Sequence, residues 1–230
     1  MTRLLIHVEG QTEESFVNEL LRSQLLAKGY EAVSARIVGN ARLRRRRGGI
    51  RPWPSVKRDI INHLKEDPGC IASTMVDFYG LPQTGVGAWP GRAAAIGLEA
   101  HGKAQCVEDA LLNDVGVELG ERFDRRRFVP FVVMHEFEGL LFSDCDAFSR
   151  SIGRPDLEAR LREVRQQFQT PEDINDSPAA HPSKRVEEIV SGYEKPLYGI
   201  LAALEVGLTR IRGECRHFDG WLRRLESLVR

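Results

Sequence analysis

Short apolar runs alternate with amphipathic stretches along the first 140 or so residues. The first run, residues 4–8, ends at Glu9 and Gly10, which predicts a buried strand followed by a turn. Apolar positions then recur at helical spacing as far as Leu25, and Gly29 supplies a stop, so this stretch is expected to be a helix. Strand, acidic turn and helix make the first structural unit.

The same pattern predicts three further strands, over residues 32–38, 70–76 and 128–134. Ser55 is expected to cap one intervening helix, and helical spacing returns over about residues 103–119. Residues 78–91 are rich in glycine and proline and predict a long surface loop. Because a parallel crossover is long enough to hold a helix, the alternation predicts an α/β fold with a doubly wound, mostly parallel sheet of about four strands.

The last third of the chain has a different pattern. From Leu157 onward it is helical or irregular. We therefore expect an α/β core over residues 1–146 and a mainly helical C-terminal extension, residues 147–230, that packs on the core. Trp221, followed by Leu225, is expected to anchor the last helix to the core.

Composition limits the partners and the cellular compartment that we expect for this protein. Thirty-three basic residues balance 33 acidic ones, so any attraction to nucleic acid must be local. The four cysteines are widely scattered and lack the close spacing of a zinc or redox motif. We therefore expect them to be reduced thiols. No apolar stretch approaches the roughly 20 residues of a membrane span, and the N-terminal one is too short for a signal peptide. A soluble, cytoplasmic protein with no membrane partner is expected.

Three acidic residues, Glu9, Asp77 and Glu136, follow predicted strands. In a doubly wound sheet, ligands bind beyond the carboxyl ends of the strands. Carboxylates are ligands that Mg²⁺ and Mn²⁺ prefer. The pattern therefore predicts a site for one of these cations, although acids also end strands simply because they face solvent.

Two more acids are candidate ligands. Glu13 could reach the cluster from the first helical turn, where a carboxylate also stabilises the positive end of a helix without another duty. Glu138 would face the same side as Glu136 in an extended segment. It could instead begin a helix that packs on the core. Glu136, closer to the strand, is the preferred ligand.

A basic loop gives the best local signal for nucleic-acid binding. It combines phosphate-binding charge with Trp53 as a possible stacking platform, and the arginines expected to bind are Arg44, Arg45, Arg46, Arg47 and Arg51. The loop could instead be solvated or dock on an acidic partner. Lys184 follows Pro182-Ser183, a helix start whose amides could bind phosphate or simply be capped.

Five motifs carry a resemblance to a known family: VEGQTEESF at 8–16, VDFYGLP at 76–82, HEFEGLLF at 135–142, HPSKR at 181–185 and HFDGWL at 217–222. They resemble the bacterial family called domain of unknown function 4276, which is itself similar to TOPRIM proteins, among them primases, topoisomerases and overcoming-lysogenization-defect nucleases. The resemblance implies that Glu9 is the metal-binding glutamate and Asp77 the first aspartate of an Asp-x-Asp pair. Tyr79 stands in place of the second aspartate, and a phenol is a poorer magnesium ligand. Glu136 or Glu138 would replace it.

The first hypothesis is a TOPRIM-like, metal-dependent nuclease or nuclease-derived subunit that acts on phosphodiesters, with Glu9, Asp77, Glu136 and Lys184 in catalysis. The resemblance further implies a role in bacterial defence beside an ATPase partner. The second hypothesis is a non-catalytic module that partners an ATPase, which Tyr79 favours. A phosphotransferase is a weaker third, because neither a Walker lysine loop nor a dinucleotide glycine fingerprint is present.

Overall fold

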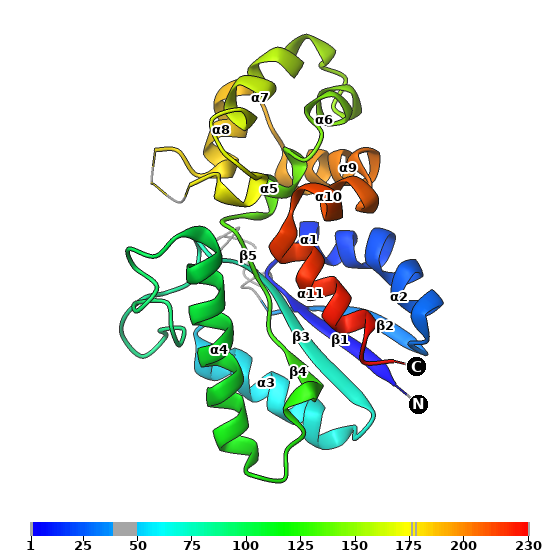
Figure 1. Cartoon of the computed structure of the whole chain (residues 1–230), viewed down its shortest axis with the longest axis vertical. Helices are drawn as coiled ribbons and strands as arrows, with labels where there is room; N and C mark the ends of the chain where they lie inside the picture. The colour runs from blue at the N-terminus through cyan, green and yellow to red at the C-terminus, as the bar shows by residue number, and fades with distance from the viewer. Residues whose placement is uncertain (1, 39–49, 176, 178, 230) are drawn as a thin grey trace.

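A parallel β-sheet forms the centre of the molecule in the computed structural model, which describes residues 2–38, 50–175, 177 and 179–229. The strand order is β2-β1-β3-β4, and β5 also pairs with β3 (Figure 1). Every pairing is parallel. The strands are β1 (Arg3–Val8), β2 (Ala32–Ile37), β3 (Cys70–Asp77), β4 (Phe128–Val129) and β5 (Val132–Val133). The protein is therefore an α/β protein with about five parallel strands.

The fourth predicted strand is divided into β4 and β5, which both pair with β3. Pro130 lies at the break, and proline has no N–H to donate to a ladder. The Thr74 hydroxyl fills the gap, because it accepts from the Phe131 amide and donates to the Phe131 carbonyl, both at 2.9 Å. The structure therefore has five strands instead of four because Pro130 interrupts the expected fourth strand.

Helices cover both faces of the sheet, as predicted. One face carries α1 (Gln11–Phe16), the π-helical turn η1 (Val17–Leu21) and α2 (Arg22–Lys28), which follow one another without a break and end at Gly29, with φ 118°. The last helix, α11 (Arg216–Glu226), shares the core on this face. The other face carries α3 (Trp53–Glu66) and α4 (Ala100–Leu119). Figure 1 shows the two sets on opposite sides of β1 and β3.

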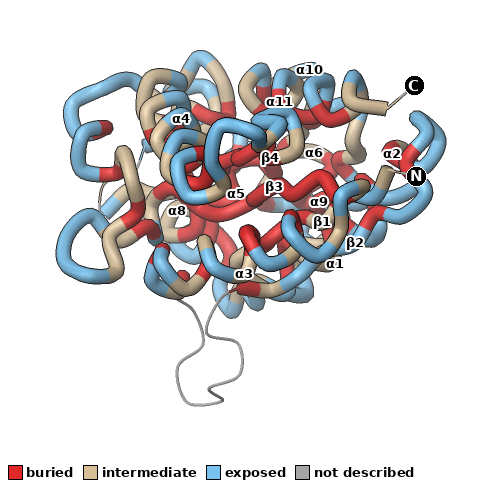
Figure 2. The backbone as a smooth tube through the Cα atoms, turned by 90° about the horizontal axis from the view of Figure 1, so that it is seen from below, coloured by how far each residue is buried: buried red, intermediate tan, exposed pale blue. Residues whose placement is uncertain are grey.

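The central strand β3 is buried along its whole length, as expected for a strand covered on both sides (Figure 2). Its side chains alternate between the two cores: Ile71 and Met75 pack with α1 and α2, and Ala72 and Val76 pack with α3 and α4. The packing on both faces fixes the end of this strand, Asp77, relative to β1.

Two predicted boundaries differ from the observed ones. α3 begins at Trp53, with Pro52 rather than Ser55 at its N-cap. Pro54 lies in the first turn, where proline is tolerated because the amides there have no intrahelical partner. α4 begins three residues earlier than expected. Residues 78–91 form no helix or strand, as predicted, although Phe78, Leu81 and Trp89 are buried and fasten this loop to the core.

Residues after the sheet are helical and gather mostly beyond the carboxyl ends of the strands (Figure 1). α9 contacts α1, α5 and α6. These helices are α5 (Phe137–Leu141), α6 (Cys145–Ser151), α7 (Glu158–Arg165), α8 (Pro182–Ile189), α9 (Lys195–Val206) and α10 (Leu208–Glu214). Short 3-10 turns complete the fold: η2 (Arg125–Arg127), η3 (Pro155–Leu157) and η4 (Pro171–Asp173).

Trp221 anchors α11 to the sheet, as expected. Its ring stacks on Phe131 with centroids 4.4 Å apart, and its Nε1 donates to the Ser73 hydroxyl at 3.0 Å. All four cysteines are unpaired. No helix in the described part of the chain is long and apolar enough to cross a membrane.

Candidate metal site at the carboxyl edge of the sheet

The acidic residues follow strands that end at the same edge. β1 ends at Val8, β3 at Asp77 and β5 at Val133. Beyond β5 the chain stays beside β3, since the Tyr79 amide donates to the His135 carbonyl at 3.0 Å. Because these strands are parallel, the residues after them lie at one end of the sheet. Glu9, Asp77 and Glu136 therefore lie at the same edge of the sheet.

Glu9 bridges the ends of β1 and β3. Its Oε2 accepts a hydrogen bond from the Asp77 amide at 3.3 Å. Gly80 passes close by, since a Cβ built there would lie 3.5 Å from Oε1 of Glu9. Burial, and then the neighbouring Glu13 carboxylate, raise the pKa of Glu9 to about 7. The environment of Glu9 therefore disfavours the charged form of its carboxylate.

Glu13 fulfils the structural expectation for a first-turn acid. Its Oε2 accepts a hydrogen bond from the Gly10 amide at 2.9 Å and so caps α1. The side chain is also buried, and burial raises its pKa. Its charge in turn raises the pKa of Glu9 and of Asp77. Glu13 therefore caps the helix and adds negative charge to the cluster.

Asp77 joins the end of β3 to the start of α5. Its Oδ1 accepts a hydrogen bond from the Phe137 amide at 2.9 Å. Burial raises the pKa of Asp77 well above its usual range, and Glu9 and Glu13 raise it further. The hydrogen bond uses one carboxylate oxygen and fixes the side chain between the two acidic neighbours.

Glu136 and Glu138 have separate partners. Glu136 is the N-cap of α5 and Glu138 lies inside the helix, so the helical alternative for Glu138 is correct. Oε2 of Glu136 accepts from the Ser183 amide at 2.8 Å and from Nδ1 of His181 at 3.0 Å. Burial acts to raise the pKa of Glu136, but Lys195 and these hydrogen bonds lower it overall. Burial raises the pKa of Glu138.

Lys195, the first residue of α9, supplies a positive charge that was not predicted from the sequence. Its Nζ lies 3.0 Å from Oε2 of Glu138. Burial acts to lower the pKa of Lys195, but Glu138, Asp77 and Glu136 raise it overall. The residue lies outside all five motifs of the resemblance, and a single lysine before a proline gives no pattern that would identify it.

His181 is a second unpredicted neighbour, although it belongs to the HPSKR motif. Its ring stacks on Tyr79 with centroids 4.4 Å apart, and its Nδ1 donates to Glu136. The amide of Ser183 at the start of α8 is thus bound by a protein carboxylate. Lys184 lies in the same helical turn and is partly buried. Its proposed phosphate contact stays a prediction.

Most of the basic loop lies outside the described residues. Arg44, Arg45, Arg46 and Arg47 lie outside the described residues. Arg51 pairs with Asp59 at 2.9 Å and with the Ser55 hydroxyl, both on α3.

The expectation that Trp53 offers a stacking platform is wrong. Its side chain is 3% exposed, packs 4.9 Å from the ring of Trp89 and donates through Nε1 to Asp114 at 2.6 Å. The ring belongs to the core between α3 and α4, because large apolar area is removed from water there.

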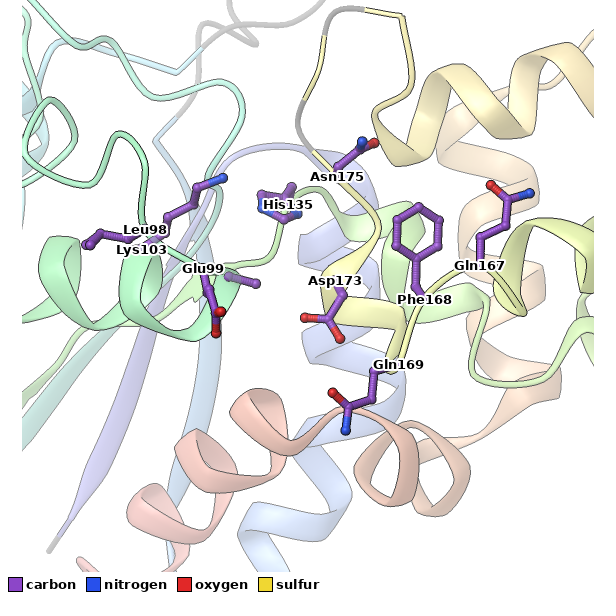
Figure 3. Close-up of a pocket in the computed structure, with 10 residues that line it drawn as sticks. Leu98, Glu99, Lys103, His135, Gln167, Phe168, Gln169, Asp173 and Asn175 are labelled. Carbon is purple, nitrogen blue, oxygen red and sulfur yellow. The ribbon is translucent and has the colours of Figure 1, made fainter.

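A groove of about 420 Å³ opens next to this edge. Its walls are the start of α4 and residues 167–175, and His135 lies between them (Figure 3). Nδ1 of His135 donates to the Ile174 carbonyl at 2.7 Å. Lys103 stands on one wall, and Phe168 and Asp173 stand on the other. The groove therefore reaches His135, the residue that precedes Glu136.

The donor set suits a hard cation with few protein ligands. Among residues 2–38, 50–175, 177 and 179–229, no three Asp, Glu, His or Cys side chains are arranged to hold one ion together. Mg²⁺ is commonly bound by one or two carboxylates, with water and phosphate completing its shell. Glu9 and Asp77, joined by the hydrogen bond from the Asp77 amide, provide that number.

A family model described as Domain of unknown function (DUF4276) matches residues 8–226, which include nearly all of the sheet and the helices beyond it. No curated protein and no solved structure matched the sequence.

Proposed function

This chain belongs to the DUF4276 family, and we propose that it is a TOPRIM-like, divalent-metal-dependent nuclease, or a subunit derived from one, that acts on nucleic acid phosphodiesters. The observation that carries the proposal is an excess of buried negative charge. Glu9, Glu13, Asp77 and Glu138 all have raised pKa values, and Lys195 is the cation that acts on each of them.

Uncompensated carboxylates are costly to bury. Mg²⁺ or Mn²⁺ would compensate this charge and would supply Lewis-acid polarisation of a phosphoryl oxygen. We assign direct coordination to Glu9 and Asp77, because their described hydrogen bonds each use a single carboxylate oxygen. Glu136 holds His181 and the start of α8 in place.

Binding of nucleic acid would use basic side chains of this chain. Lys184 in the first turn of α8, together with the predicted arginines Arg44, Arg45, Arg46, Arg47 and Arg51, would contact phosphates. A role in bacterial defence with an ATPase partner rests on the resemblance to the family alone.

The decisive experiment compares wild type with Glu9→Gln, which keeps the shape of the side chain and removes its charge. DNA and RNA cleavage is measured with Mg²⁺ or Mn²⁺, with and without the candidate ATPase. We expect Glu9→Gln to lose cleavage by orders of magnitude, since an ion needs its carboxylate ligands. Glu19→Gln, an exposed change on the same helical segment, is the matched control. If Glu9→Gln cleaves as well as wild type does, the proposal of nuclease activity is refuted.

A second candidate function is the non-catalytic module that partners an ATPase. The observation that favours it is the stacking of Tyr79 on His181. Tyr79 stands where the TOPRIM pattern has its second aspartate, so this position holds a ring contact in place of a carboxylate. Absence of cleavage by wild type with its partner, together with retained association of Glu9→Gln, would support this alternative.

A further inference from the structure

We propose that this protein forms a homodimer through a row of exposed leucines on α9, with the two copies of the helix packed antiparallel across a two-fold axis. The row, called the leucine stripe below, consists of Leu197, Leu201 and Leu204, which are 51%, 39% and 46% exposed. The dimer does not depend on the metal site or on nuclease activity.

The leucine stripe differs from the other exposed apolar side chains of the described residues. Its members are four and three residues apart, so they lie along one side of α9. The other large ones are single residues on α2 and α4, Leu26 and Val117, or lie between β3 and α4. Scattered apolar residues are ordinary on a protein surface, whereas a continuous apolar row indicates an interaction surface.

The opposite side of α9 is apolar as well. Ala202, Ala203 and Val206 are buried, and the helix contacts α1, α5 and α6. The sequence of α9 contains two charged residues, Lys195 and Glu205. A helix that is apolar all round is normally buried on every side. One side of α9 is open in the single chain, so the sequence of this helix suits an assembled state better than a monomer.

A second copy of the same helix matches the leucine stripe. A two-fold interface brings the same surface of both subunits together, so that surface must be complementary to itself. With the axis at Leu201, antiparallel helices place Leu201 against Leu201 of the partner subunit. They also place Leu197 against Leu204 of the partner subunit, because these positions lie four and three residues from the axis. Leucine therefore meets leucine along the whole stripe, with the residue spacing of a coiled-coil seam.

The two flanks of the leucine stripe determine the direction of the second helix. Tyr198 and Glu205 lie on one flank, and Ile200 lies on the other. Parallel helices would bring opposite flanks together, so the Glu205 carboxylate would face Ile200 of the partner subunit and lose water without gaining a hydrogen bond.

Antiparallel helices bring like flanks together. Ile200 then lies next to its own copy, and Glu205 lies near Tyr198 of the partner subunit, whose hydroxyl can donate to a carboxylate. Glu205 contacts Arg150 of α6 through Oε1 at 3.5 Å, which assigns the new contact to Oε2. The net charge of the chain is zero, so two copies do not repel each other as a whole.

The size of the leucine stripe predicts a weak dimer. A standard interface uses about 20–30 residues of each partner. α9 has 12 residues and exposes one side, which the partly buried Ile200 and Tyr198 extend. We therefore expect a dissociation constant on the order of micromolar to tens of micromolar.

The first experiment measures the mass of the full-length protein by sedimentation velocity at concentrations from about 1 to about 200 μM. We expect wild type to change from one chain to two as the concentration rises. Leu201→Glu places two carboxylates against each other at the axis, so it should stay monomeric. Val117→Glu is the matched control, because Val117 is 78% exposed on α4, and it should dimerise as wild type does. Leu204→Glu serves if circular dichroism shows that Leu201→Glu is unfolded.

Introduced cysteines test the direction of the helices. Leu201→Cys lies on the axis and should form a disulfide-linked dimer under mild oxidation, because it meets its own copy. Leu197→Cys alone should not link, whereas the double variant Leu197→Cys/Leu204→Cys should. Non-reducing electrophoresis separates the linked chains, and wild type gives the background from the four native cysteines.

Each outcome supports or overturns the dimer. Wild type that stays monomeric at every concentration, or Leu201→Glu that dimerises as wild type does, would overturn it. If wild type stays monomeric and Leu201→Glu loses association with the candidate ATPase, the leucine stripe belongs to that partner instead. Linking of Leu197→Cys as efficient as that of Leu201→Cys would overturn the antiparallel order. Metal binding and cleavage are measured separately, so the proposed function can fail or hold independently.

Discussion

Nδ1 of His181 lies 3.0 Å from Oε2 of Glu136, which joins the residue before α8 to the N-cap of α5. The same oxygen accepts from the Ser183 amide at 2.8 Å. Glu136 therefore connects two helices at the edge of the sheet. Through this oxygen Glu136 holds neighbouring groups in position, and its expected role as a metal ligand stays a prediction.

Replacing Glu136 should therefore reduce stability even without metal. Glu136→Gln keeps one acceptor oxygen but removes the charge that strengthens both hydrogen bonds, and we expect a loss of about 1–3 kcal/mol in the free energy of unfolding. Urea denaturation in a chelating buffer measures it. Glu187→Gln, an exposed change on α8, should alter the value by less than about 0.5 kcal/mol. Equal effects of the two variants would contradict the connecting role.

The raised pKa of Glu9 predicts a particular dependence of stability on pH. Because the folded protein holds this proton up to a pKa of about 7, and the unfolded chain releases it near 4.5, the folded state binds more protons between these values. The contribution of Glu9 is fully present below pH 4.5 and is lost as pH rises to about 7. It amounts to at most about 3 kcal/mol.

Urea midpoints of metal-free protein between pH 4.5 and 7.5 test this slope. Glu9→Gln cannot release a proton, so its stability should fall less over this range than that of wild type. Parallel curves for the two proteins would show that Glu9 is ionised throughout the range.

Metal binding should raise the melting temperature in a way that depends on Asp77. At a free concentration 100 times the dissociation constant, one bound ion stabilises a protein by about 2.7 kcal/mol. Asp77→Asn keeps Oδ1 as an acceptor for the Phe137 amide and removes the charge, so the Mn²⁺-dependent rise should disappear. Asp109→Asn, an exposed change on α4, should keep it. A full rise in Asp77→Asn would remove Asp77 from the site.

The arginine run makes an independent prediction. Changing Arg44, Arg45, Arg46 and Arg47 to alanine should weaken nucleic-acid binding and flatten its dependence on salt, because each lost phosphate contact lowers the slope by about one. Fluorescence anisotropy at several salt concentrations measures both quantities. An unchanged slope would assign the arginines to solvent or to another partner.

The pattern of apolar residues was sufficient to predict those elements of the fold that are determined by residues close together in the sequence. The strand before Glu9, the helix that ends at Gly29 and the strand that ends at Asp77 follow from periodicity and a glycine stop. Two misses had visible signals. Pro130 lacks the N–H that a continuous strand needs, and Pro52 marks the true start of α3.

The partners within the site could not be predicted in the same way. Lys195 and Glu138 are 57 positions apart in the sequence, and they meet because α9 packs against α5. Periodicity describes one element at a time and does not predict such pairs. Trp53 shows the converse, since an aromatic residue next to a basic loop suggested a binding surface, while packing against Trp89 places it in the core.

The break between β4 and β5 also affects how the sheet can meet other chains. These short strands form one border of the sheet, and a complete border strand offers a row of N–H and C=O groups to which a foreign strand can add. Here each piece is two residues long, Pro130 offers no donor, and the Val132 amide already donates to Oε1 of Glu108 on α4 at 2.9 Å. The interruption therefore protects this border against strand addition, and so against aggregation.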